Sequence, residues 1–152
     1  MKRVGELLGA LTLVGGLTWL LLNLHGPHAG LDVTVGAVLA AGGLVLLMPH
    51  RIRLPRLVTT FVMVMVAIAG TAAGLAHATV RIGGAYVYLT DRGFPVTWVQ
   101  RGAIADDPDT AQRLARAANW TVDLISLATN LLVWAYLGMI FVVIAVLIRR
   151  KA

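Results

Sequence analysis

Three histidines and two aspartates are the residues of this chain that could ligate a metal or haem. His25 and His28 lie between the first two apolar segments, and Asp32 lies at the start of the second. His77 ends the third apolar segment and Asp123 precedes the fourth, so the expected topology gathers all five near one membrane surface. Imidazole and carboxylate groups bind zinc, copper or non-haem iron, and paired histidines can hold haem. No local motif such as H-E-x-x-H fixes their geometry, so we favour ordinary interfacial histidines and capping aspartates, and predict no cofactor.

A second polar set has the spacing of one helical face. Asn119, Asp123, Ser126 and Asn130 are separated by four, three and four residues. Because an ionisable side chain is costly to expose to lipid, this stripe should face protein or a water-filled path. It could line a substrate or ion path, or it could form interhelical hydrogen bonds at an interface. We favour the interface.

Other catalytic signatures are absent from the sequence. The chain has no cysteine, which excludes disulfides, thiolate metal sites and iron–sulfur clusters. It also lacks a G-x-S-x-G motif, a P-loop, a dinucleotide-binding fingerprint and an inverted repeat of the kind found in many transporters. The sequence therefore favours a non-enzymatic role.

The elements that carry these residues are predicted to be membrane helices. Of the 152 residues, 59% are hydrophobic and only 13% are charged, whereas about 25% are charged in soluble domains. Four apolar segments each approach the roughly 20 residues that span a bilayer. We predict an all-α membrane protein with one four-helix domain over residues 1–152, whose helices lie at about 4–24, 31–48, 57–77 and 109–149.

Basic residues predict the orientation of these helices. Eight of the thirteen lysines and arginines lie at the two termini or in the short connection after the second helix. The positive-inside rule therefore places both termini in the cytoplasm of a multi-pass protein in a bacterial-type plasma membrane. The positive-inside distribution of basic residues thus explains the net charge of +6, and no nucleic-acid partner is predicted. Anchoring to anionic cytoplasmic lipid is predicted for Arg51, Arg53, Arg56, Arg149 and Arg150.

The longest polar segment is the predicted extracytoplasmic insertion at residues 78–120. Bulky residues alternate over residues 85–99 around a turn signal at residues 90–93, so a small β-hairpin is expected. An isolated two-stranded hairpin is marginal in water, which means that lipid headgroups or a partner subunit should cover it.

The second half of the insertion carries a helix start. Asp107 before Pro108, or Asp109 three residues before Gln112, matches the pattern of a capped helix. No helix breaker follows, so the fourth helix is predicted to begin near Asp109 and to run unbroken to about Arg149. Small residues at positions 5–9 and 70–74 predict that helices pack closely.

Three functions are compatible with these features. The favoured hypothesis is a non-catalytic accessory or scaffolding subunit of a larger integral membrane complex. An alternative is a homo-oligomeric transporter or channel component with a pathway lined by Asp123, Ser126 and Asn130. A weaker alternative is a metal- or haem-binding redox protein that uses His25, His28 and His77. Under the favoured hypothesis, other membrane subunits or further copies of the chain contact Tyr86, Tyr88, Phe94, Trp98, Asn119, Asp123, Ser126 and Asn130.

Overall fold

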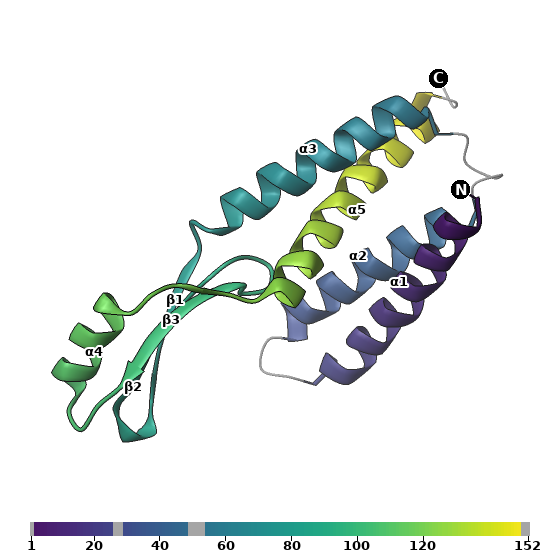
Figure 1. The fold of residues 1–152 in the computed structure, drawn as a ribbon. Coiled ribbons are helices and arrows are strands. Elements are labelled where there is room, and N and C mark those ends of the chain that lie inside the picture. The colour runs from purple at the N-terminus through teal and green to yellow at the C-terminus, as the bar shows by residue number, and fades with distance from the viewer. Residues whose placement is uncertain (1, 26–28, 49–53, 150–152) are drawn as a thin grey trace. The chain divides into compact units, whose positions relative to one another are not determined.

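The computed structural model describes residues 2–25, 29–48 and 54–149 and divides into two compact units (Figure 1). The helical unit comprises residues 1–68 and 132–152, and the sheet unit comprises residues 69–131. Helix α3 (Arg56–Gly74) and helix α5 (Leu124–Arg149) each contribute residues to both units.

Four helices are long and apolar enough to span a membrane, which confirms this part of the prediction. They are α1 (Lys2–Asn23), α2 (Ala29–Leu47), α3 and α5. Large apolar side chains cover their outer surfaces, and Leu22, Leu57 and Ile125 are all more than three-quarters exposed. Surfaces of this kind are favourable against lipid and unfavourable against water, so the four helices are suited to span a membrane.

Helices α1 and α2 of the helical unit lie side by side with their backbones in close approach (Figure 1). A Cβ atom on Gly16 would lie 2.6 Å from the backbone nitrogen of Ala40, and one on Gly43 would lie 2.5 Å from that of Leu13. No side chain larger than a hydrogen atom fits at these positions. The small residues therefore set the distance between the two helices.

The core of the helical unit centres on Tyr136 of α5, which is 1% exposed. Its ring lies against Gly42 of α2, where an added Cβ would come within 2.3 Å of it. The Tyr136 hydroxyl donates a hydrogen bond of 3.1 Å to the hydroxyl of Thr12, so its polar atom is satisfied inside the apolar core. The other buried members of this core are Val35, Val38, Leu39, Val133 and Met139.

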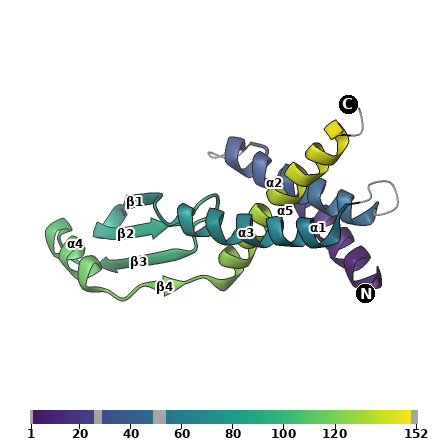
Figure 2. The same ribbon diagram turned by 90° about the horizontal axis from the view of Figure 1, so that it is seen from above.

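The sheet unit contains four strands in the order β1 (Ala78–Gly83), β2 (Val87–Arg92), β3 (Val99–Ile104) and β4 (Thr121–Val122) (Figure 2). Every neighbouring pair is antiparallel. A short 3-10 helix, η1 (Gly84–Tyr86), joins β1 to β2, and helix α4 (Pro108–Ala117) packs on β2 and β3. Ala111 and Ala115 are the buried face of α4, because residues four apart lie on one side of a helix.

The predicted hairpin is part of this larger sheet, so the fold is mostly helical with a small antiparallel sheet and is not all-α. The turn predicted at residues 90–93 is wrong, because residues 90–92 belong to β2 and pair with both β1 and β3. The connection between β2 and β3 covers residues 93–98. Two added strands pair with the hairpin and α4 packs on β2 and β3, which gives it support that an isolated hairpin lacks.

The prediction of one unbroken helix over residues 109–149 is wrong. Helix α4 ends at Ala117 and α5 begins at Leu124, and β4 lies between them. Thr121 and Val122 are β-branched, and in the folded chain they pair with the edge of β3. Pairing with β3 is therefore more favourable for these two residues than a helical conformation, and this pairing requires that β3 is already in place.

Candidate binding site on the sheet unit

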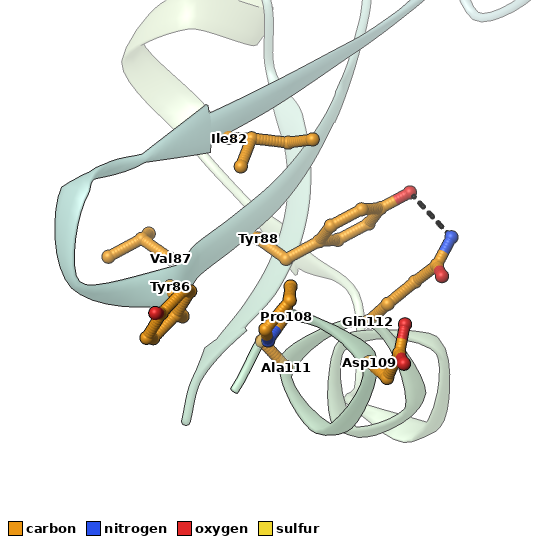
Figure 3. Close-up of a pocket in the computed structure, with 8 residues that line it drawn as sticks. All are labelled: Ile82, Tyr86, Val87, Tyr88, Pro108, Asp109, Ala111 and Gln112. Carbon is orange, nitrogen blue, oxygen red and sulfur yellow. Dashed lines mark hydrogen bonds between the residues drawn. The ribbon is translucent and has the colours of Figure 1, made fainter. Parts of the chain in front are cut away.

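An open cleft of about 150 Å³ lies between the β1–β2 end of the sheet and the first turn of α4 (Figure 3). Its walls are mostly apolar, and Asp109 is the carboxylate among the lining side chains. This combination suits an apolar group that carries or adjoins a positive charge. The lining residues are Ile82, Tyr86, Val87, Tyr88, Pro108, Asp109, Ala111 and Gln112.

Two elements fix the walls of the cleft. Gln112 of α4 donates a hydrogen bond of 3.4 Å to the Tyr88 hydroxyl of β2 (Figure 3). The start of α4 is held by Asp107, whose carboxylate accepts a 2.9 Å hydrogen bond from the backbone N–H of Thr110. Hydrogen bonds from the side chain and backbone of Thr110 lower the pKa of the Asp107 carboxyl, which is therefore charged at neutral pH. The negative charge is favourable at a helix amino terminus.

Tyr86 has an unusual backbone conformation at the mouth of this cleft. Its φ angle is 51°, a left-handed value that costs a residue with a Cβ roughly 1–2 kcal/mol. The ring is nonetheless 49% exposed, so burial of this side chain does not offset the cost fully. Strained residues that persist without an evident packing reason are concentrated at functional sites.

The outer edge of β1 is open. No other strand in the described part of the chain pairs with it, and all six of its residues are exposed. Val80 and Ile82, which are 53% and 73% exposed, alternate with Thr79 and Arg81 along this strand. Ile82 also lines the cleft, so the open edge and the cleft form one continuous surface.

The four aromatic residues predicted to contact partners do not form a single surface. Tyr86 and Tyr88 line the cleft near the start of β2. Phe94 and Trp98 lie in the connection beyond the other end of β2, and the Phe94 ring lies 5.7 Å from that of His77. A strand of six residues is roughly 20 Å long, so β2 separates the two pairs.

The four polar residues predicted to share a helical face are also separated, and that geometric prediction is wrong. Asn119 and Asp123 lie between α4 and α5, outside both helices. Asp123 caps α5, because its carboxylate accepts hydrogen bonds from the N–H groups of Ile125 and Ser126 and from the Ser126 hydroxyl. The hydrogen bonds from Ser126 lower the pKa of Asp123. Asp123 and Ser126 therefore form a local cap of α5, and their contact with a partner stays a prediction.

Asn130 holds the connection between β2 and β3. Its side-chain oxygen accepts a 3.0 Å hydrogen bond from the Val96 N–H, and its amide nitrogen donates a 2.6 Å bond to the Val96 carbonyl. Asn130 is fully buried. Its amide oxygen and nitrogen both have partners, so the residue has a structural role within the sheet unit.

The histidines do not form a metal site among the residues that the structure describes. His77 is exposed in the turn between α3 and β1, and His25 is exposed after α1 in the other unit. His28 lies outside the described residues. Within the described ranges, no group of three or more His, Asp or Glu side chains could hold a metal ion.

Two of the predicted cytoplasmic anchors can be located. Arg56 is the first residue of α3 and Arg149 the last of α5, and both are exposed. Arg51, Arg53 and Arg150 lie outside the described residues.

An ion pair inside the sheet was missed at the sequence level. Arg81 of β1 donates from Nε to the Asp91 carboxylate of β2 at 2.6 Å, and Asp91 is 1% exposed. The alternating residues of Ala78–Gly83 and the small residues four apart in α4 were the signals that could have predicted the extra strand and the packed helix.

Comparisons with models of protein families, with characterised proteins and with solved structures found no match to this chain. The candidate site therefore rests on three geometric features, namely the cleft, the open edge of β1 and the strained Tyr86.

Proposed function

We propose that the protein is a non-catalytic accessory subunit of a larger integral membrane complex, and that its sheet unit binds an extended segment of a partner subunit. The observation that carries this proposal is the open β1 edge beside the cleft. The exposed edge of a strand offers unpaired N–H and C=O groups, and proteins either block such edges or use them for recognition.

The features of β1 favour recognition over protection. An edge that must avoid other chains is usually short, bulged, proline-containing or rich in free lysine. β1 is six residues long and pairs with β2 without a bulge, and its one charged side chain, Arg81, is in an ion pair with Asp91. A partner strand could therefore hydrogen-bond to β1 without leaving a free charge against it.

The cleft specifies the chemistry of the partner segment. An apolar side chain of the added strand would pack on Ile82 and enter the space beside Tyr86 and Tyr88. A neighbouring lysine or arginine would meet Asp109, with the exposed carboxylates of Asp106 and Asp107 close by in the chain. We therefore expect a segment in which apolar and basic residues alternate.

The orientation predicted from the basic residues belongs to the same proposal, with both termini in the cytoplasm and the sheet unit on the opposite side. Because the chain has no cysteine, single cysteines can be introduced without background labelling. A membrane-impermeant maleimide added to intact cells should label Thr97→Cys, which is exposed, and should label a cysteine at Ala152 only after the cells are opened. The reverse pattern would contradict the orientation.

The transporter hypothesis has less support than the accessory-subunit hypothesis. Asp123 and Asn130, which were expected to line its pathway, use their polar atoms in a helix cap and in the hydrogen bonds to Val96. The redox hypothesis relied on convergence of three histidines, and within the described ranges no group of three His, Asp or Glu side chains could hold a metal ion.

Site-specific photo-crosslinking tests the proposed function. A benzoylphenylalanine side chain at Ile82 should give one discrete adduct in native membranes, mapped by mass spectrometry to an extended segment of another membrane protein. Ile104 offers a matched control, because it is 70% exposed, close to the 73% of Ile82, and does not line the cleft. The same probe at Ile104 should give no such adduct.

The same partner should co-purify in mild detergent, and Ile82→Arg should abolish its co-purification while Ile104→Arg should not. A monodisperse monomer without a co-purifying protein, or equal adducts from both probe positions, would overturn the proposal.

A further inference from the structure

Two arginines and a tryptophan form a compact cluster at one end of the sheet. The guanidinium carbon of Arg92 lies 5.1 Å from the centre of the Trp120 ring, and that of Arg101 lies 4.3 Å from it. Arg92 is opposite Val99, and Arg101 is opposite Thr90, so the two arginines are diagonal neighbours on one face of the sheet. Trp120 precedes β4 and brings its ring to both.

Among the described residues, neither arginine of this cluster is recorded in an ion pair. The ion pair recorded in the described part of the sheet unit joins Arg81 and Asp91, and it includes neither Arg92 nor Arg101. Arg101 is held in place by a 3.2 Å hydrogen bond from its Nη1 to the Arg116 carbonyl. Two like charges on a single ring repel one another, so a bound anion would stabilise the arrangement.

Two aspartates lie close to this cluster, but each has partners of its own: Asp91 is in an ion pair with Arg81, and Asp123 caps α5. The other three acidic residues of the sheet unit lie at the opposite end of α4. Asp106, Asp107 and Asp109 surround the first turn of α4, and a helix of ten residues is roughly 15 Å long. Arg101, in contrast, is bonded to the last turn of that helix through Arg116. Three of the five carboxylates of the sheet unit therefore lie beside the cleft, and the arginine cluster lies around Trp120.

The cluster lies at the end of the sheet from which α5 begins. Val122 pairs with Val99, which pairs with Arg92, and α5 starts two residues after Val122. Measured along the strand direction at roughly 3.3 Å per residue, Arg92 lies about 7 Å from the level at which the apolar helix starts, and Arg101 about 14 Å from it. The polar layer on each side of a bilayer is about 5–7 Å thick, so a flexible Arg92 side chain reaches the phosphate level. Tryptophan is enriched at this same level.

We propose that Arg92, Arg101 and Trp120 bind the phosphate group of an anionic phospholipid in the leaflet beside the sheet unit. The exposed guanidinium of Arg92 donates hydrogen bonds to the phosphate, and the anchored guanidinium of Arg101 supplies a second positive charge. The Trp120 ring, which is 38% exposed, packs between them and the glycerol region of the lipid. This inference does not depend on the proposed partner segment, because it uses the other end of the sheet.

Native mass spectrometry of the full-length protein, titrated in detergent with phosphatidylglycerol or phosphatidylcholine, tests the site. One arginine near an anionic membrane surface contributes about a fivefold gain in binding. We expect Arg92→Gln and Arg101→Gln each to lower phosphatidylglycerol affinity about fivefold, and the double variant roughly 25-fold, with phosphatidylcholine affinity unchanged. Arg113→Gln is the matched control, because Arg113 is an exposed arginine of α4 that does not contact Trp120.

Three results would overturn the proposal. Equal losses in Arg92→Gln and Arg113→Gln would show a general charge effect. Displacement of phosphatidylglycerol by millimolar inorganic phosphate would show a site for a free anion. An unchanged lipid preference in the double variant would show that the cluster binds no lipid. Arg92→Lys keeps the charge and checks folding, and it should retain most of the lipid preference with an unchanged melting temperature.

Discussion

Replacing Asn130 by alanine should loosen the connection between β2 and β3 at residues 93–98. The substitution removes both hydrogen bonds to Val96, at 3.0 and 2.6 Å, from a residue that is fully buried. A net loss of about 1 kcal/mol per hydrogen bond, and up to about 3 kcal/mol for each polar group left unpaired, applies in proteins generally. Hydrogen bonds in membrane proteins contribute less, about 0.6 kcal/mol on average and at most about 1.7. For two hydrogen bonds, these values predict a loss of about 1–4 kcal/mol.

Hydrogen exchange measured by mass spectrometry reports this loss locally. Because about 1.4 kcal/mol corresponds to a factor of ten, the backbone N–H groups of residues 93–98, of which Pro95 has none, should exchange about fivefold to several-hundred-fold faster in Asn130→Ala than in the wild-type protein. Thr129→Ala is the matched control, since the Thr129 hydroxyl bonds only to the Ile125 carbonyl within α5. It should leave the exchange of residues 93–98 nearly unchanged.

A second variant separates hydrogen bonding from packing. Asn130→Leu keeps a side chain of similar size but cannot pair with Val96, so it should exchange as fast as Asn130→Ala. If the N–H groups of residues 93–98 exchanged as slowly in Asn130→Leu as in the wild-type protein, the hydrogen bonds to Val96 would not be what holds the connection. The volume of the side chain would then be sufficient.

Three further substitutions test other parts of the fold. Gly42→Ala places a methyl group 2.3 Å from the Tyr136 ring, so it should lower stability by about 1–3 kcal/mol and reduce the melting temperature in detergent. Asp107→Ala removes the cap of α4. Because the folded-state pKa of Asp107 is lowered from 3.8, this stabilisation is present above that value and is lost as pH falls through the folded-state pKa. Wild type and Asp107→Ala should therefore differ in melting temperature at about pH 6, and the difference should disappear as the pH falls well below 3.8. Arg81→Gln leaves the Asp91 carboxylate buried without its ion partner, and should cost about 1–2 kcal/mol after allowance for the 64% exposure of the arginine side chain.

Each of these predictions has an outcome that contradicts it. An unchanged melting temperature for Gly42→Ala would mean that α2 and Tyr136 are not in contact. If the melting temperatures of wild type and Asp107→Ala differed by the same amount at every pH, the ionised carboxylate of Asp107 would not be what stabilises the cap. For the ion pair, the double variant Arg81→Gln with Asp91→Asn should recover part of the lost stability, and strictly additive losses would show that the two groups do not interact.

The helical part of the fold was predictable because its signal is local. Spanning helices need roughly 20 apolar residues in succession, and such a run can be recognised without information from the rest of the chain. The cap at Asp107 and Pro108 was also recognisable, since a cap involves residues within one turn. The polar character of residues 78–120 followed from composition alone.

The sheet and its site were decided by contacts between residues far apart in the sequence. The helix predicted over residues 109–149 was divided because Thr121 and Val122 pair with β3, some 20 residues earlier in the chain. The supposed stripe through Asn130 was misread because its partner, Val96, lies 34 residues away. Strand pairing and buried hydrogen bonds depend on which strand edges and polar groups the folded chain brings together. The spacing of residues along a helix does not predict these contacts. The sequence alone therefore determined four helices long and apolar enough to span a membrane and a polar insertion between two of them. The tertiary structure decided that the insertion forms a sheet with an open edge, a cleft and a separate basic cluster.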